Sequence, residues 1–130
     1  MFVKIIIYAD ENKYSAVLIS GENKKRVRKR TNLNSKIKTL LTGIIDCLEK
    51  LKYPVEIEII SDSRKLGNVL NEDIEVYKNK KYVTENIKLW KKLNNLLNEQ
   101  IYYTFTYNDS KEKDDRIFRE LYRDCLYKRF

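Results

Sequence analysis

The sequence predicts a single α/β domain built on a mixed five-stranded sheet, with three antiparallel strands first, two parallel strands after them, and helices flanking the sheet. Three observations lead to this prediction. The chain has 130 residues, the usual size of one domain. Its apolar residues recur in blocks with either a strand or a helix period. Strand patterns come first, and helical patterns then separate the later strands, which favours parallel neighbours joined by right-handed crossovers.

The first part of the chain is typical of an antiparallel meander. The β-branched run 2–8 (FVKIIIY) predicts a buried strand that ends at the polar turn 9–12. Residues 14–20 (YSAVLIS) predict a second strand, and the turn signal at 21–23 (GEN) leads into a third strand over 24–31. We therefore expect three consecutive strands, with the third at an edge of the sheet.

The rest of the chain alternates between helical and strand patterns. The expected elements are, in order, a helix over 37–51, a strand over 55–60 (VEIEII), a short helix over 64–70, a helix over 86–98, a strand over 101–107 (IYYTFTY) and a helix over 115–128. The segment 71–84 is polar without a clear period, and 108–114 is expected to be a charged loop.

The chain is strongly basic, with 27 Lys and Arg against 19 Asp and Glu and a formal net charge of +8. A charge of this sign favours polyanionic partners, nucleic acid first and an anionic membrane surface second. An AT-rich genome would also raise the lysine content. The apolar N-terminal run is too short for a signal sequence, and no stretch is long enough to span a membrane, so we expect no membrane association and a cytoplasmic location.

Metal binding, if it occurs, must use oxygen ligands. The chain has no histidine, and its two cysteines, Cys47 and Cys125, lie far apart in predicted helices, where we expect reduced core thiols. This composition excludes the usual zinc site. Carboxylates are the ligands that Mg²⁺ prefers.

Two aspartates follow predicted strands. Asp10 comes at the end of the first strand, and Asp62 comes at the end of the strand after the first long helix. If these strands are parallel neighbours, both carboxylates lie at the same edge of the sheet, within reach of a shared metal ion. Each aspartate alone would also fit a turn cap, but the pair in this topology favours a metal site.

Three short motifs in this order resemble the ribonuclease H family. Residues 8–10 (YAD) resemble its first-strand aspartate motif, 60–63 (ISDS) its fourth-strand T/S-D-S motif, and 86–90 (NIKLW) the N-x-x-L-W opening of a later helix. The similarity in element order covers nearly the whole chain. The resemblance implies a ribonuclease H-like fold and, in an active member, cleavage of the RNA strand of RNA–DNA hybrids with Mg²⁺ or Mn²⁺ held by carboxylates.

The same resemblance implies an incomplete set of acids. The family's third acid, early in the first long helix, falls on Lys38 or on Leu40, depending on which end of the helix anchors the comparison. The fourth acid, which opens the last helix, falls on Arg119. Asp115 or Asp114 would replace it only if that helix began one turn earlier.

The resemblance also assigns roles to individual residues. The residues expected at the site are Asp10, Asp62 and Asp115 as catalytic acids, Asp10 and Asp62 as metal ligands, and Asn34, Ser35, Lys38 and Ser63 as contacts to nucleic acid. Asp46, the nearest acid on the first long helix, is expected on its solvated surface. If Lys38 and Arg119 face the two aspartates, ion pairs would replace the metal ions.

Three functions are consistent with the sequence. The first is a ribonuclease H-like domain that binds nucleic acid, such as an RNA–DNA hybrid, or a protein partner, with nuclease activity impaired or lost. The second is an active Mg²⁺- or Mn²⁺-dependent ribonuclease H. The third is a protein-interaction module that binds no nucleic acid.

Two surface features each have two interpretations. The basic run 24–30 (KKRVRKR) would either grip phosphates or protect an edge strand from pairing with other chains, and the second interpretation is favoured. Tyr102, Tyr103 and Tyr107 would either stack on bases or pack in and around their strand, and packing is favoured.

Overall fold

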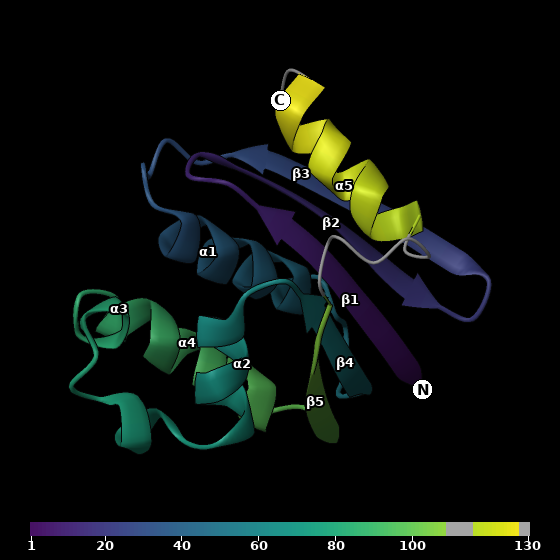
Figure 1. The fold of residues 1–130 in the computed structure, drawn as a ribbon. Helices are drawn as coiled ribbons and strands as arrows, with labels where there is room; N and C mark the ends of the chain where they lie inside the picture. The colour runs from purple at the N-terminus through teal and green to yellow at the C-terminus, as the bar shows by residue number, and fades with distance from the viewer. Residues whose placement is uncertain (109–115, 128–130) are drawn as a thin grey trace.

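The computed structural model describes residues 1–108 and 116–127 and confirms the predicted sheet (Figure 1). The strands lie in the order β3-β2-β1-β4-β5. β1 pairs antiparallel with β2, and β2 with β3, whereas β4 pairs parallel with both β1 and β5. The strand bounds are Phe2–Ala9 for β1, Lys13–Ser20 for β2, Asn23–Arg30 for β3, Glu56–Ser61 for β4 and Tyr102–Tyr107 for β5.

The predicted helices are present, with two short turns in addition. The bounds are Lys36–Glu49 for α1, Arg64–Asn71 for α2, Ile74–Tyr77 for the 3₁₀ helix η1, Lys81–Thr84 for α3, Ile87–Asn98 for α4 and Arg116–Tyr127 for α5. η1 and α3 lie in the segment in which the sequence shows no clear period. Each is a single helical turn, which is too short to produce a periodic pattern. None of the helices within 1–108 and 116–127 is long and apolar enough to cross a membrane.

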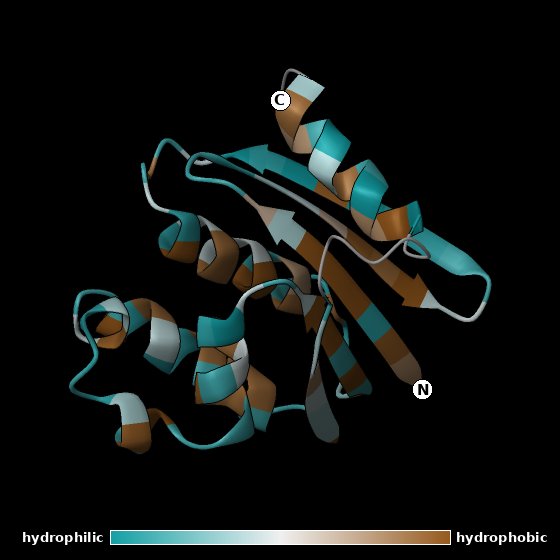
Figure 2. Ribbon diagram, viewed as in Figure 1, coloured by the Kyte–Doolittle hydropathy of each residue, from teal (hydrophilic) through white to brown (hydrophobic). Residues whose placement is uncertain are grey.

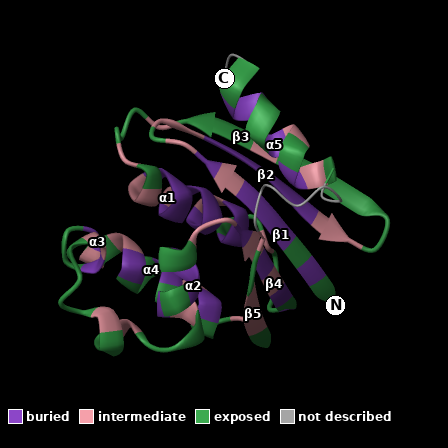
Figure 3. Ribbon diagram, in the orientation of Figure 1, coloured by how far each residue is buried: buried purple, intermediate pink, exposed green. Residues whose placement is uncertain are grey.

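Helices cover both faces of the sheet. Figure 1 shows α5 on one side and α1 with α2, α3 and α4 on the other. β1 and β2 are mostly buried between these layers, while β3 is exposed along most of its length (Figure 3). The larger core cluster lies on the α1 side, and a smaller one of Ile6, Val17, Phe118 and Leu121 lies under α5.

Gly43 sets how closely α1 approaches the sheet. A Cβ atom at this position would lie 2.6 Å from Ile7 Cδ1 and 2.8 Å from Tyr14 Cγ, which is closer than van der Waals contact allows. Only glycine therefore permits this spacing between α1 and the strands β1 and β2. The middle of α1 is thereby held close to the sheet.

β3 is an edge strand, as expected for the basic run, and it is the most hydrophilic strand in Figure 2. Two of its arginines form ion pairs with α5. Arg26 Nη2 lies 2.6 Å from Glu120 Oε2, and the Arg28 Nε–H donates to Asp124 Oδ2 at 2.9 Å. The basic strand therefore fastens α5 to the sheet.

Asp124 is the buried centre of this attachment. Its side chain is only 7% exposed, and the same Oδ2 that faces Arg28 also accepts a hydrogen bond from the Ser15 hydroxyl at 3.0 Å. Ser15 is fully buried in β2. One carboxylate thus joins α5 to two strands that lie about a hundred residues earlier in the chain.

We expect Asp124→Ala to lower the free energy of unfolding by about 2 to 3 kcal/mol, because Ser15 and Arg28 then lose their charged acceptor. Glu120→Ala is the matched control, since its ion pair with Arg26 is exposed and should contribute less than about 1 kcal/mol. Urea unfolding followed by circular dichroism measures both variants. Equal losses would contradict the role assigned to Asp124.

Candidate active site

The parallel pairing of β1 and β4 positions the two predicted acids. The register runs from Phe2 opposite Glu56 to Ile6 opposite Ile60. Asp10 follows the last residue of β1, and Asp62 follows the last residue of β4. Both therefore lie at the carboxyl ends of neighbouring parallel strands, which is the edge where the sequence predicted a site.

Tyr8 is a common neighbour of both carboxylates. Burial, the charge of Asp62 and, more weakly, the charge of Asp10 raise the pKa of Tyr8 to about 12. The Tyr8 ring packs edge-on against Phe118 and Tyr122 of α5, with centroid distances of 5.9 and 5.1 Å. The acids thus lie beside an aromatic cluster on the α5 side of the sheet.

The two carboxylate oxygens of Asp10 have different surroundings. Oδ1 accepts hydrogen bonds from the backbone N–H groups of Asn12 at 2.9 Å and Lys13 at 2.7 Å, which closes the turn between β1 and β2. The other oxygen, Oδ2, has no hydrogen bond or ion pair with residues in the described part of the chain. The turn cap and the metal ligand, two interpretations left open by the sequence, are therefore compatible at this residue.

Asp62 faces a cation that the sequence did not single out. Lys36 Nζ lies 4.0 Å from Asp62 Oδ2 and 5.5 Å from the centre of the Tyr8 ring. The Asp62 side chain is 15% exposed and that of Lys36 is 52% exposed. Sequence spacing had pointed to Lys38, but Lys36, two residues earlier, provides the ammonium group beside Asp62.

Two predicted nucleic-acid contacts serve as helix caps. The Ser35 hydroxyl oxygen accepts from the Lys38 N–H at 3.2 Å at the start of α1. The Ser63 hydroxyl oxygen accepts from the Leu66 N–H at 3.2 Å at the start of α2. These bonds fix where both helices begin, at the same edge as the acids.

The remaining residues predicted near this edge, Asn34, Lys38 and Leu40, differ in burial and in their contacts. Asn34 is exposed in a left-handed conformation with φ of 53°, and its N–H donates to Asn12 Oδ1 at 2.8 Å. Lys38 is half-buried in the first turn of α1. Leu40, the other candidate for the third acid, is 2% exposed and belongs to the core. The family's third acid therefore has no carboxylate counterpart at either position.

α5 brings its C-terminal half to the site. α5 runs in the same direction as β3. Arg26 forms an ion pair with Glu120, and Arg28, further along β3, forms one with Asp124, further along α5. The Cys125 thiol lies 3.9 Å from the carbonyl oxygens of both Tyr8 and Lys13. Arg119 is exposed about one turn before the Tyr122 that contacts Tyr8. Asp114 and Asp115 lie outside the described residues.

Burial keeps the Cys125 thiol protonated and raises its pKa to about 12, with a further contribution from the charge of Asp10. Cys47 and Cys125 are both buried free thiols, as expected. Neither is therefore activated as a nucleophile at neutral pH.

Asp46 is more buried than the sequence predicts. The sequence predicts a solvated position, whereas the Asp46 side chain is only 27% exposed and accepts a 2.6 Å hydrogen bond from the buried Tyr14 hydroxyl. Burial and this hydrogen bond hold the pKa of Tyr14 far above its usual value. Lys29 Nζ lies 3.8 Å from the same carboxylate. Asp46 therefore anchors β2 and β3 to α1.

The described residues fit a two-metal site poorly. Among them, no group of three or more acids and cysteines is placed so as to hold a metal ion. Asp10 and Asp62 are the acids at the predicted edge, and Lys36 already places a positive charge beside Asp62. Two Mg²⁺ ions require an excess of negative charge from surrounding oxygen ligands, which this arrangement does not supply.

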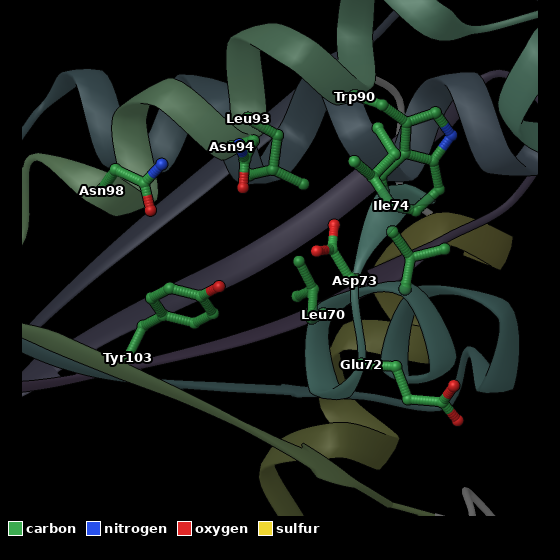
Figure 4. Close-up of a pocket in the computed structure, with 10 residues that line it drawn as sticks. Leu70, Glu72, Asp73, Ile74, Trp90, Leu93, Asn94, Asn98 and Tyr103 are labelled. Carbon is green, nitrogen blue, oxygen red and sulfur yellow. The ribbon is translucent and has the colours of Figure 1, made fainter. Parts of the chain in front are cut away.

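A separate pocket of about 280 Å³ opens between α2, α4 and β5 (Figure 4). None of the residues predicted for the site lines it. Its two acids have structural partners, since Asp73 accepts from the Glu75 N–H and Glu72 accepts from the Tyr77 hydroxyl. Tyr103 lines its edge and is half-buried, but Tyr102 is 62% exposed, so the expected packing of the β5 tyrosines holds only in part.

Comparison with known proteins agrees with the observed fold. The structure resembles the crystal structure of RNase H1 from the halophilic archaeon Halobacterium salinarum NRC-1, with a TM-score of 0.61, 14% sequence identity, and coverage of 93% of this chain and 91% of that one. This likeness defines the fold as ribonuclease H-like. No protein-family model matches the sequence.

Two curated relatives, both named Ribonuclease H, come from two type A strains of Clostridium botulinum. Each is 32% identical over 112 residues, an alignment that covers 72% of this chain and 75% of the relative. The chain therefore belongs to the ribonuclease H family.

We expect Lys36→Gln to strengthen Mn²⁺ binding about threefold to tenfold, because an ion at Asp62 Oδ2 would otherwise meet the ammonium group 4.0 Å from that oxygen. Lys52→Gln, which removes an exposed charge just before the start of β4, should change the Mn²⁺ affinity less than about twofold. Electron paramagnetic resonance of free Mn²⁺ measures both affinities. The electrostatic account fails if the two variants bind Mn²⁺ equally.

Proposed function

We propose that this chain is a nucleic-acid-binding ribonuclease H domain in which metal-dependent cleavage of RNA–DNA hybrids is weak or lost. The observation that carries the proposal is the ion pair between Lys36 and Asp62. A lysine at that distance repels a divalent ion at the carboxylate that would bind it. An RNA–DNA hybrid would then be held without being cut.

Family membership and charge support the nucleic-acid part of the proposal. The ribonuclease H relatives point to a nucleic-acid-related domain, and the net charge of +8 favours contact with a phosphate backbone. A protein partner is the alternative occupant of the same domain. Absence of binding to hybrid, duplex and single strands at low salt would favour that alternative.

A second candidate function is an active Mg²⁺- or Mn²⁺-dependent ribonuclease H. The name and the 32% identity of the two clostridial relatives favour it. It needs further carboxylates beside Asp10 and Asp62, and Asp115 and Asp114 are the acids that the sequence offers. Both lie outside the described residues.

We expect the purified chain to cleave an RNA–DNA hybrid at close to the background rate, even with ample Mg²⁺ or Mn²⁺, because two aspartates beside a lysine hold metal ions weakly. Asp10→Asn should then lower any residual rate by less than about twofold. Gel analysis of end-labelled hybrid measures the rates, with an active ribonuclease H as the positive control.

The opposite result is equally clear. Robust hybrid cleavage by the unmodified chain, abolished by Asp10→Asn, would contradict the proposed loss of activity. Asp115→Asn and Asp114→Asn would then identify which acid completes the site.

A further inference from the structure

The two edges of the sheet differ in charge. β3, at one edge, has six Lys or Arg among its eight residues, whereas β5, at the other edge, has no charged residue (Figure 1). Charged side chains along an edge strand oppose its pairing with another chain. The β5 edge therefore lacks this protection, although the chain as a whole has a net charge of +8.

Every second residue of β5 turns its backbone groups away from β4. The Asn108 N–H donates to the Ser61 carbonyl oxygen at 2.9 Å, in the register that places Ser61 beside Tyr107. Bonded positions alternate along a strand, so the even-numbered residues bond to β4, while Tyr103, Phe105 and Tyr107 direct their N–H and C=O groups to the open edge. Outside the strand pairing itself, these groups form no backbone hydrogen bond with the described residues.

A groove of about 580 Å³ lies against the same strand. Its walls are residues 102–105 of β5 and the C-terminal ends of α2 and α4, and none of its lining residues is charged. Ile101 and Tyr102 line it while remaining 64% and 62% exposed. A strand that approaches this edge therefore meets a neutral and partly apolar surface.

The sequence of β5 reads the same in both directions about Phe105, since residues 103–107 are YTFTY. Antiparallel strands related by a twofold axis pair the residues that lie at equal distances from the axis. We propose that β5 pairs antiparallel with β5 of a second copy of this chain, with the twofold axis at Phe105. The two sheets then join into one continuous sheet.

Across this axis each residue faces its own type. Phe105 faces Phe105 of the second copy, Tyr103 faces Tyr107, and Thr104 faces Thr106. The Phe and Tyr pairs occupy the outward positions, where each pair exchanges two backbone hydrogen bonds. Aromatic pairs and Thr–Thr pairs are among the favourable cross-strand contacts.

Charge identifies the second copy of β5 as the occupant of this edge. Each of the other four strands contains at least one Lys, Arg, Asp or Glu, so β5 is the one strand of the described chain that would bring no charge to the neutral edge. A single strand pair is a small interface, and we therefore expect a weak, reversible dimer.

The pairing fixes how the two candidate sites are arranged. The two copies of β5 run in opposite directions, so the edges that contain Asp10 and Asp62 lie at opposite ends of the joined sheet. A dimer would then hold two nucleic acids, and would not grip one from both sides. This consequence rests on the proposed function, whereas the pairing itself rests on β5 alone.

Sedimentation equilibrium of the full chain, at concentrations from about 10 to 500 µM, tests the pairing. Tyr107→Pro is the main variant, because proline removes an outward N–H and leaves the bonds between β4 and β5 in place. Tyr107→Val is the matched control, since it keeps that N–H. Both variants remove the ring that Arg64 covers at 5.0 Å.

We expect the unmodified chain to dimerise, and Tyr107→Pro to raise the dimer Kd at least about thirtyfold relative to Tyr107→Val, because each dimer loses two hydrogen bonds. Added salt should strengthen the dimer, since it screens the repulsion between two copies of charge +8, whereas salt weakens nucleic-acid binding. Circular dichroism checks that both variants fold.

A second measurement needs no variant. Isotope-filtered nuclear Overhauser spectra of labelled chain mixed with unlabelled chain detect only contacts between copies. We expect contacts between Tyr103 and Tyr107 and between Thr104 and Thr106, each pair spanning the two copies.

Three results would overturn the proposal. They are a chain that stays monomeric over the whole concentration range, a dimer that Tyr107→Pro and Tyr107→Val weaken equally, and contacts between copies that map away from β5. None of these results depends on nucleic-acid binding or on cleavage. Failure of the dimer would therefore leave the proposed function standing, and strong cleavage of a hybrid would leave the dimer standing.

Discussion

The parallel pairing of β1 with β4 is the constraint on which the rest of the site depends. It aligns the ends of two strands that are more than forty residues apart in the sequence and so brings Asp10 and Asp62 to one edge. Side chains alternate between the faces of a sheet, so a slip of one residue would move Asp62 to the face opposite Tyr8. The close approach of α1 to Ile7 and Tyr14 at Gly43 holds the middle of this helix against β1 and β2, and its first residue, Lys36, lies beside Asp62.

Both acids at this edge have partners within the protein. One oxygen of Asp10 closes a turn, and one oxygen of Asp62 faces Lys36, so each acid gives part of its capacity to the protein itself. With Lys36 beside Asp62, this edge has less negative charge than a pair of divalent ions requires.

The fold was predictable from the sequence because strand and helix periods differ and the polar turns mark the strand ends. The two aspartates were found for the same reason, since both directly follow apolar runs. Lys36 was missed because the comparison relied on spacing within the helix, although the N-cap at Ser35 shows that Lys36 opens α1. The hydrogen bond from Tyr14 to Asp46 joins residues from separate elements, and no local pattern in the sequence predicts such a contact.

The attachment of α5 has a consequence for how the chain folds during synthesis. All five strands and the helices on the opposite face are translated before α5. Until α5 leaves the ribosome, Ile6 and Val17 on the sheet lack their partners Phe118 and Leu121, and the buried hydroxyl of Ser15 lacks Asp124. The nascent sheet therefore exposes one apolar face to water. A chaperone that shields this face would be needed after β5 is synthesised and before α5 packs on the sheet.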